Sequence, residues 1–257
     1  MIRRTLSCMP FLGLLLSACV TTSNSPFQSD KTSMKQAAQD NVALAIQYLK
    51  SGNRNAAMEK VQKAIDEDPD SANAYTAEAL IYNANGDLSN AKSAYKTAMR
   101  KAPDDPEIEN DYAVFLCQHG DAKGSIDYFM KAAANPRYST PDAAYSNAGL
   151  CAQHIPDLKA ADQYFRQALA RNPTMLEPMA QLAAISYQQK NYLSARAFIE
   201  RFNALSPSSR PDVLLLGVEN ERALGDQQAA TDYAKRLMKL YPTSTQAQQL
   251  QQGVPRG

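Results

Sequence analysis

Hydrophobic residues recur every three or four positions along Asn110–Pro136, in two short runs joined by the turn His119-Gly120-Asp121. The apolar faces of the two runs consist of Tyr112, Ala113 and Leu116, then Ile126, Phe129 and Ala132. This spacing predicts two amphipathic helices that stop at Asn135-Pro136. A helix pair this short cannot bury its apolar face alone, so neighbouring pairs of the same design are expected.

The same pattern returns along the chain at intervals close to 34 residues. The prolines that close successive pairs, spaced by 34, 33, 37, 34 and 35 residues, are Pro69, Pro103, Pro136, Pro173, Pro207 and Pro242. The turns between helices carry Gly52, Gly86, Gly120 and Gly225, with Pro156 and Lys190 substituting in the fourth and fifth copies. Small residues recur where the helices must cross closely: Ala45, Ala79, Ala113, Gly149 and Ala183.

A 34-residue period with small residues at the crossings resembles the tetratricopeptide repeat over roughly residues 38–241. The resemblance implies an all-α superhelix of about six helix-turn-helix repeats. The alternative is an irregular helical bundle in which the alanine spacing arises by chance.

Residues 1–18 predict a lipoprotein signal peptide. A basic start precedes an apolar run, 9–16, that is too short to span a bilayer. The run ends in Leu16-Ser17-Ala18-Cys19, which is similar to the bacterial lipobox, so we expect cleavage before Cys19 and lipidation of its thiol by diacylglycerol, with palmitate among the acyl chains. An ordinary signal peptide with an accidental cysteine is the alternative. The residue after the cysteine is Val20 and not aspartate. In Gram-negative lipoproteins this pattern implies export of the protein to the outer membrane, here to its periplasmic face.

The remaining chain divides into three parts. Residues 19–33 are polar and aperiodic, and predict a lipidated flexible tether with a reach of roughly 20 Å. The repeat solenoid is expected over 34–242, with one irregular insertion, Asn135–Pro141, whose two prolines exclude a continuing helix. Residues 243–257 begin with the helix-capping pair Thr243-Ser244 and predict a polar tail or a helix that caps the last repeat.

Net charge argues against a nucleic-acid partner. The chain has 27 Lys+Arg and 26 Asp+Glu, and removal of Arg3 and Arg4 with the signal peptide leaves 25 against 26. No basic stripe with interleaved aromatic residues is present in the sequence, so nucleic acid is excluded as a partner.

Two cysteines, Cys117 and Cys151, remain after the signal peptide and the lipidation site are accounted for. They lie 34 residues apart, on the first helices of neighbouring repeats, which lie side by side in this fold. Because the periplasm is oxidising, a structural disulfide is expected, and two buried free thiols are the alternative. A zinc site that adds His119 and His154 is disfavoured, because Cys-x-His spacing on one helix points the two side chains apart.

The sequence carries no recognisable catalytic motif. It lacks a Gly-rich phosphate loop, a Gly-x-Ser-x-Gly elbow, a His-Glu-x-x-His motif and the Cys-x-x-Cys spacing of a redox enzyme. We therefore expect a binding protein without enzymatic activity, cofactor, metal or small-molecule substrate. An enzyme carried on a helical scaffold is a distant alternative.

A solenoid of helix pairs presents a concave face that is lined by its first helices and binds peptides or helices. The repeat register places on this face Val42, Ile46, Leu49, Thr76, Leu80, Asn83, Asn110 and Val114, followed by Cys117, Ser146, Leu150 and Gln153. Leu44, Ala45 and Tyr48 are expected in the core between helices instead. Since the first repeat is the most apolar, the main partner contact is expected there. The alternative is that residues 32–40 cover it.

The lipobox, the repeats and the segment Asn-Asp-Tyr-Ala-Val-Phe-Leu-Cys-Gln-His-Gly at 110–120 together resemble the PilF/PilW family of type IV pilus biogenesis lipoproteins. Asp111 and Ser125 depart from that family's pattern. The resemblance implies a pilotin: an outer-membrane lipoprotein that binds secretin subunits and promotes their localisation and multimerisation. A tetratricopeptide lipoprotein that serves β-barrel assembly or cell-wall synthase activation is the alternative.

Overall fold

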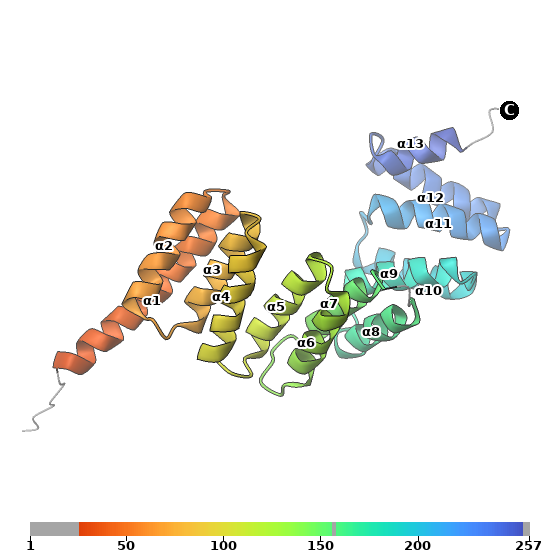
Figure 1. Cartoon of the computed structure of the whole chain (residues 1–257). Helices are drawn as coiled ribbons and strands as arrows, with labels where there is room; N and C mark the ends of the chain where they lie inside the picture. Colours follow the sequence, from red (N-terminus) through yellow and green to blue (C-terminus); the bar gives the residue numbers. More distant parts are fainter. Residues whose placement is uncertain (1–25, 156–157, 254–257) are drawn as a thin grey trace, which may run out of the picture.

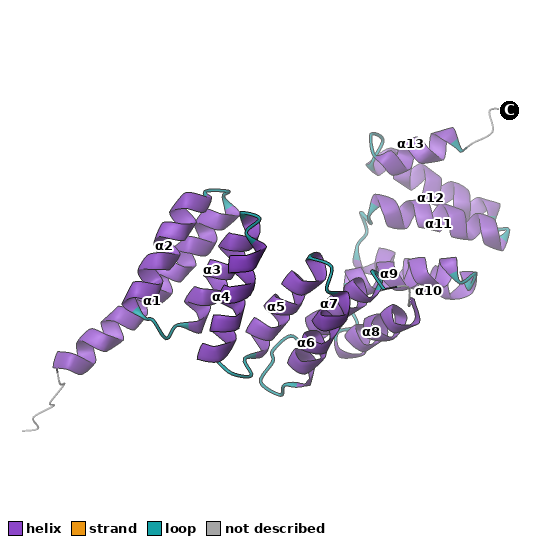
Figure 2. Ribbon diagram, viewed as in Figure 1, coloured by secondary structure: helices purple, strands orange, loops and turns teal. Residues whose placement is uncertain are grey.

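The structure, a computed structural model, describes residues 26–155 and 158–253, and in that part of the chain every regular element is a helix (Figures 1 and 2). The helices are α1 (Pro26–Lys50), α2 (Arg54–Glu67), α3 (Ala72–Ala84), α4 (Leu88–Lys101), α5 (Pro106–Gln118), α6 (Ala122–Ala134), α7 (Pro141–Ala152), α8 (Leu158–Arg171), α9 (Leu176–Gln188), α10 (Tyr192–Leu205), α11 (Pro211–Leu224), α12 (Gln227–Leu240) and α13 (Thr245–Gln252). The predicted all-α repeat superhelix is confirmed.

The helices pack as six antiparallel pairs that follow one another along the solenoid (Figure 1). Within each repeat the odd-numbered helix packs on the even-numbered helix that follows it, from α1 on α2 to α11 on α12. Each second helix then packs on the first helix of the next repeat. Among the described residues, no helix is both long enough and apolar enough to cross a membrane.

Local sequence fixes where the helices start and stop. Four of the predicted turn glycines have a left-handed backbone, with φ between +79° and +89°. Lys190 adopts the same region (φ 59°) at the equivalent turn, whereas Pro156 lies outside the described residues. An Asn or Asp follows most of these turns and caps the second helix, as Asp121 does by accepting from the Gly124 N–H at 3.0 Å.

Where the two helices of a repeat cross, a small residue on the first helix meets a larger one on the second. Gly149 of α7 and Phe165 of α8 show the fit at a crossing, because a Cβ on Gly149 would lie 2.6 Å from the Phe165 ring. The predicted crossing residues Ala45, Ala79, Ala113 and Ala183 are fully buried. So are their counterparts on the second helices, Val61, Tyr95, Phe129, Phe165 and Ile199.

The insertion between the third and fourth repeats is an ordered loop. It joins the end of α6 at Ala134 to Pro141, the first residue of α7. Tyr138 is buried against Ala113, Phe129 and other members of the third-repeat core, and its N–H donates to the Asn135 carbonyl at 3.0 Å. The extra residues therefore add a core side chain between the repeats.

The predicted tether is too long at its carboxyl end. Helix α1 starts at Pro26, so residues 26–33 are helical and belong to the first helix of the solenoid. Proline is well tolerated at the first position of a helix, where its missing N–H would have no partner, and no helix breaker follows it. A helix nucleated by the packed residues 38–49 can propagate through this polar stretch at little cost. Residues 1–25, with the predicted signal peptide and Cys19, lie outside the described part of the chain.

The short helix α13 packs on α11 and α12 at the end of the solenoid. Its N-cap, Ser244, accepts from the Ala247 N–H at 3.1 Å. Ala247 and Leu250 are buried against Leu214, Val218 and Leu237, and the glutamines between them face outward. Helix α13 thus occupies the place where the first helix of a further repeat would stack.

Candidate partner-binding face

The first helices form the inner layer of the solenoid. Helix α1 contacts α3, α5 contacts α7, α7 contacts α9, and α9 contacts α11. The second helices pack outside them, each on its own first helix and on the next one. Because the inner layer is the more closely spaced, the solenoid curves toward the first helices, and this concave face is the candidate binding surface.

In the first repeat, the apolar residues predicted for the concave face are half-buried instead of free. Val42, Ile46 and Leu49 all pack against a core cluster of α1, α2 and α3 that consists of Ala45, Ala57, Val61, Ala77 and Ile81. The expectation that they point away from the core is therefore wrong in part. Residues 32–40 continue the same helix α1 and cannot fold back over them, which removes that alternative.

Leu44 is the reverse case. It was predicted in the core between helices, but its side chain is 41% exposed. In the third repeat the equivalent residue, Tyr112, packs against Tyr95 of the preceding repeat, whereas no repeat precedes the first one among the described residues. The exposed apolar side chain of α1 thus lies at the open end of the solenoid, while Ile46 lies two positions along and is half-buried.

The predicted residues of the second and third repeats are mostly engaged with the protein itself. The Thr76 hydroxyl donates to the Ala72 carbonyl at 3.0 Å, and Leu80 packs on the core cluster between the second and third repeats. Asn83 Oδ1 lies 2.7 Å from Nε2 of His119, across the junction between α3 and α5. Asn110 accepts a 3.2 Å hydrogen bond from Asn147 of α7.

Val114 lines a hollow of about 270 Å³ between α5 and α7, together with the predicted Cys117 and Leu150. Its other lining residues are Gln118, Phe129, Asn147 and His154. The hollow is therefore apolar at its floor and carries two amides and an imidazole at its rim. Ser146, which was predicted for the same face, is buried and does not line it.

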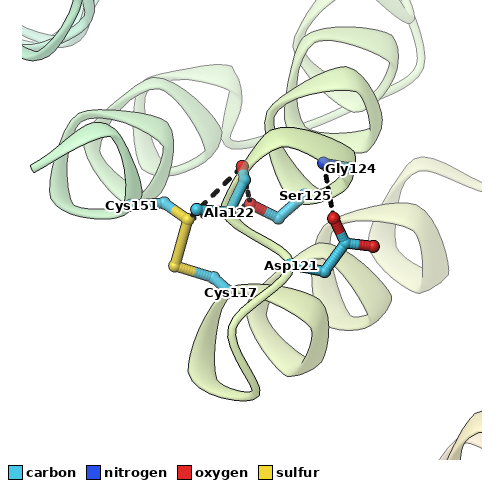
Figure 3. Close-up of a disulfide and its surroundings, with 6 residues drawn as sticks. All are labelled: Cys117, Asp121, Ala122, Gly124, Ser125 and Cys151. Carbon is cyan, nitrogen blue, oxygen red and sulfur yellow. Dashed lines mark hydrogen bonds between the residues drawn. A yellow bond between two sulfur atoms is a disulfide. The ribbon is translucent and has the colours of Figure 1, made fainter. Parts of the chain in front are cut away.

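Cys117 and Cys151 are joined by a disulfide that ties α5 to α7 beside this hollow, with the two Cα atoms 5.8 Å apart (Figure 3). Figure 3 also shows how Ser125, one of the two departures from the family pattern, is accommodated. Its buried hydroxyl donates to the Ala122 carbonyl at 2.8 Å, and its Oγ lies 2.9 Å from Cys151 Sγ. The hydroxyl is thus satisfied within its own helix.

A second hollow, of about 290 Å³, was missed by the sequence reasoning. It lies between α9, α11 and α13, with Ala180, Ala184, Val213, Leu215 and Leu216 as apolar lining and Gln181, Gln246 and Gln249 among its polar groups. The repeat register could have indicated Ala180 and Ala184, but the glutamines of α13 join the face only because the last helix folds back on α11.

The charged groups beside the second hollow pair with one another. Nη1 of Arg210 lies 2.5 Å from a carboxylate oxygen of Glu177, and the same guanidinium forms an ion pair with Asp212. The hydrogen bonds that Arg210 donates to the Asp212 carboxylate raise the pKa of Arg210. Two carboxylates share this one guanidinium, and Glu219, which also lines the hollow, adds a third carboxylate, so this end of the face has an excess of negative charge.

Asp111, the other departure from the family pattern, lies at the junction between the second and third repeats. Burial raises the pKa of its carboxyl to about 6, and the nearby carboxylates of Glu107 and Asp105 act in the same direction. A hydrogen bond from Asn110 opposes this shift. Its charge helps to raise the pKa of the buried Tyr95, and it lines neither hollow, so we assign it no binding role.

Comparison with known proteins places the chain in a functional context. A family model described as a tetratricopeptide repeat matches residues 48–108. The type IV pilus assembly protein PilF of Pseudomonas aeruginosa is 26% identical over 241 residues, which cover 93% of this chain and 95% of that protein. An uncharacterised protein of Haemophilus influenzae is 28% identical over 138 residues, covering 54% of this chain and 74% of that protein.

Solved structures agree with these relationships. The crystal structure of PilW, described as a widely conserved type IV pilus biogenesis factor, superposes with a TM-score of 0.74 at 28% identity, over 84% of this chain and 99% of that one. The structure of Pseudomonas aeruginosa PilF gives a TM-score of 0.75 at 24% identity, over 86% of this chain and 100% of that one, and supports the same fold. By sequence and by structure, the chain is a tetratricopeptide-repeat homologue of the type IV pilus biogenesis proteins PilF and PilW.

Proposed function

We propose that this protein is an outer-membrane lipoprotein that binds secretin subunits and promotes their localisation and multimerisation during type IV pilus biogenesis. The observation that carries the proposal is the similarity to the Pseudomonas aeruginosa type IV pilus assembly protein over 93% of the chain. The similarity spans all the repeats and is not confined to the 61-residue stretch, 48–108, that matches the general repeat model. It therefore favours the pilus over other envelope machines that use the same repeat.

The fold supports a role in binding. The two hollows on the first helices are open and shallow. Their walls combine apolar side chains with amides, and the second hollow also has the charged side chains of Arg210, Asp212 and Glu219. Such a surface suits the side of a polypeptide. On this basis the protein acts as a scaffold for secretin subunits and not as a catalyst.

The position where α1 begins indicates how closely a lipid on Cys19 would hold the repeat domain to the membrane. If Cys19 carries the acyl chains, only residues 20–25 separate the lipid from a continuous helix of 25 residues. Helix α1 then holds the repeat domain close to the membrane, at a height set by the helix itself. Multiple acyl chains anchor a protein stably, whereas a single chain does so only marginally.

Deletion of the gene tests the proposal directly. The expected result is that secretin remains monomeric or mislocalised and that surface pili are lost, with both restored by the wild-type gene. Secretin multimers are followed by gel electrophoresis and their location by membrane fractionation. Normal multimers in the deletion strain would overturn the proposal, and co-purification with a β-barrel-assembly or cell-wall partner would then favour the alternative.

A pair of variants tests the first-repeat contact. Ile46→Asp places a charge on the half-buried concave side of α1, where an unpaired charge against an apolar partner costs several kcal/mol. Leu44→Asp introduces the same charge at an exposed position on another side of that helix and serves as the matched control. We expect secretin assembly to fail only with Ile46→Asp, provided that circular dichroism and urea unfolding show a folded domain. Equal assembly in both variants would exclude the first repeat as the contact.

The anchor is tested by Cys19→Ala. We expect the variant to lose labelling by palmitate and to leave the membrane fraction, while wild-type protein retains both. Palmitate labelling that persists in the variant would contradict lipidation at this residue.

A further inference from the structure

Charged side chains are unevenly divided between the inner and outer layers of the solenoid. The inner helices α3, α5, α7, α9 and α11 contain nine Asp and Glu residues and one basic residue, Arg222. The outer helices α4, α6, α8, α10 and α12 contain fourteen Lys and Arg residues and four Asp and Glu residues. The near-zero net charge of the chain therefore conceals an acidic inner layer and a basic outer layer.

Helix α4 is the most one-sided of the outer helices, with four basic residues and no acidic one. Three of them recur at intervals of four positions along one side of the helix, and we call Lys92, Lys96 and Arg100 the α4 basic stripe. All three are exposed, and none of them forms an ion pair with any described residue. The guanidinium of Arg100 donates to the hydroxyl of Thr97 at 2.7 Å, which is a neutral partner.

The two carboxylates that contact the ends of α4 are engaged elsewhere. Asp87 caps the helix and accepts from the backbone N–H of Asn90 at 3.2 Å. Asp70 pairs with Lys101, the fourth basic residue of α4, at 2.6 Å. Like charges four positions apart repel each other and destabilise a helix. The α4 basic stripe therefore carries a repulsion that an anionic ligand would relieve.

The stripe continues into an exposed apolar side chain. Leu88, the first residue of α4, lies one turn before Lys92 on the same side, and its side chain is 39% exposed. An exposed leucine beside a row of cations suits the headgroup region of a bilayer, because the leucine enters the interface while the long basic side chains keep their charges at the phosphates. The outer layer is also the convex one, so a flat surface reaches α4 without entering a cleft.

We propose that the outer side of α4 is a membrane-contact surface that binds the anionic headgroups of phospholipids. The inference rests on the proposed function only for the presence of a membrane nearby, since residues 20–25 alone would separate a lipid on Cys19 from α1. With α4 against the bilayer, the inner layer faces away from the lipid. The contact thus leaves the concave face open to a partner in the periplasm.

The first experiment measures lipid binding without the anchor. It uses residues 19–257 with Cys19→Ser, a chain that keeps every described helix but cannot be acylated. Flotation is compared between vesicles of phosphatidylcholine alone and vesicles that also contain phosphatidylglycerol. We expect binding only to the anionic vesicles and its loss at high salt, because salt screens the headgroup charges. Absence of binding to the anionic vesicles at low salt would overturn the proposal.

Matched variants locate the contact. Lys92→Gln combined with Lys96→Gln should weaken binding about 25-fold, at about fivefold for each basic residue near an anionic surface. Lys92→Arg combined with Lys96→Arg keeps both charges and should bind as wild type. The control, Lys50→Gln combined with Lys190→Asn, removes two exposed charges at the ends of the inner helices α1 and α9, and should also bind as wild type. Equal weakening in the glutamine pair and the control would mean that only net charge matters, and would overturn the stripe.

The second experiment maps the contact on the whole lipoprotein, inserted into the same vesicles through its own acyl chains. Acetylation of each lysine by a water-soluble reagent is read by mass spectrometry. Labelling of Lys92 and Lys96 should be largely lost when phosphatidylglycerol is present, whereas labelling of Lys50 and Lys190 should not change. Equal labelling of all four lysines in both kinds of vesicle would contradict the contact.

The outcomes separate this inference from the proposed function. Purified peptidoglycan and DNA are tested as other polyanions, and binding of either one without binding of anionic vesicles would overturn the membrane assignment. Vesicle binding that depends on Lys92 and Lys96 would support the α4 contact even if deletion of the gene left secretin multimers normal, a result that overturns only the proposed function. Failure of the whole protein to insert into vesicles would count against acylation of Cys19, and the flotation result would still decide the α4 contact.

Discussion

Two junctions between neighbouring repeats have the same arrangement of helices but are stabilised by different contacts. One joins the third and fourth repeats, and the other joins the second and third. At the former, α6 and α7 meet through small residues, Tyr138 fills the space between them, and a disulfide ties α5 to α7. At the latter, α4 and α5 meet through aromatic rings. The ring centroid of Tyr95 lies 5.5 Å from those of Tyr112 and Phe115.

The two junctions also differ in their polar groups. The third-to-fourth junction has a covalent link, and its buried Ser125 hydroxyl is satisfied. The second-to-third junction contains the partly buried Asp111, whose pKa is about 6, and the exposed contact between Asn83 and His119. The comparison shows that a repeat period fixes the placement of helices but not the strength of the contacts between them. We expect the second-to-third junction to open more easily and to respond to pH.

Removal of the disulfide should have the largest effect. Cys117→Ser combined with Cys151→Ser frees a loop of 34 residues, which should lower the free energy of unfolding by roughly 3–4 kcal/mol in the chain-entropy model. Urea unfolding of wild type and variant measures this difference. Thiol titration of the denatured, unreduced protein is the control, and two titratable thiols per mature chain would show that the bridge does not form in the cell.

Gly149→Ala should have the next largest effect. Its new Cβ would lie 2.6 Å from the Phe165 ring, which is fully buried. Overpacking of this kind typically costs about 1–3 kcal/mol. Ala113→Gly, the opposite change at the equivalent site of the third repeat, should cost about 1 kcal/mol through helix propensity and a lost methyl contact. A Gly149→Ala variant as stable as wild type would mean that the helices can separate there.

Asp111→Asn should stabilise the protein in a pH-dependent way. The folded pKa of about 6 lies above the value near 3.9 expected in the unfolded chain, so the folded state holds its proton more tightly. Stability from this group is fully present below pH 4 and is lost as pH rises through 6. The variant should gain about 1–2 kcal/mol at pH 7.5, after allowance for partial exposure, and nothing at pH 4. An equal gain at both pH values in urea unfolding would contradict this origin.

Asn83→Ala should have the smallest effect. It removes the 2.7 Å contact with His119 across the second-to-third junction, in an exposed setting where one hydrogen bond contributes at most about 1 kcal/mol. Asn73→Ala, which changes an exposed residue on the same helix, is the matched control. Hydrogen exchange at α4 and α5 should increase in the first variant only, and equal exchange in both would show that this contact does not hold the junction closed.

The sequence by itself determined the repeat number, the turns between the helices of each pair and the crossing points. These features depend on local chemistry, which one stretch of chain contains in full. Asp121 can cap only the helix that follows it, and Gly120 adopts a positive φ wherever the turn requires it. Gly149 and Phe165 lie within one repeat, so their close packing is also encoded in a short segment.

Tertiary structure decided which side chains are free to bind. Leu44 and Ile46 belong to one amphipathic pattern, and their exposure was predicted the wrong way round because it depends on whether a neighbouring repeat is present to cover them. Helix α1 extends to Pro26 because packing of its later residues stabilises a polar stretch that has no periodicity of its own. The glutamines of α13 reach the concave face because the burial of Ala247 and Leu250 on α11 and α12 brings them there, and a contact between distant segments leaves no periodic mark in either one.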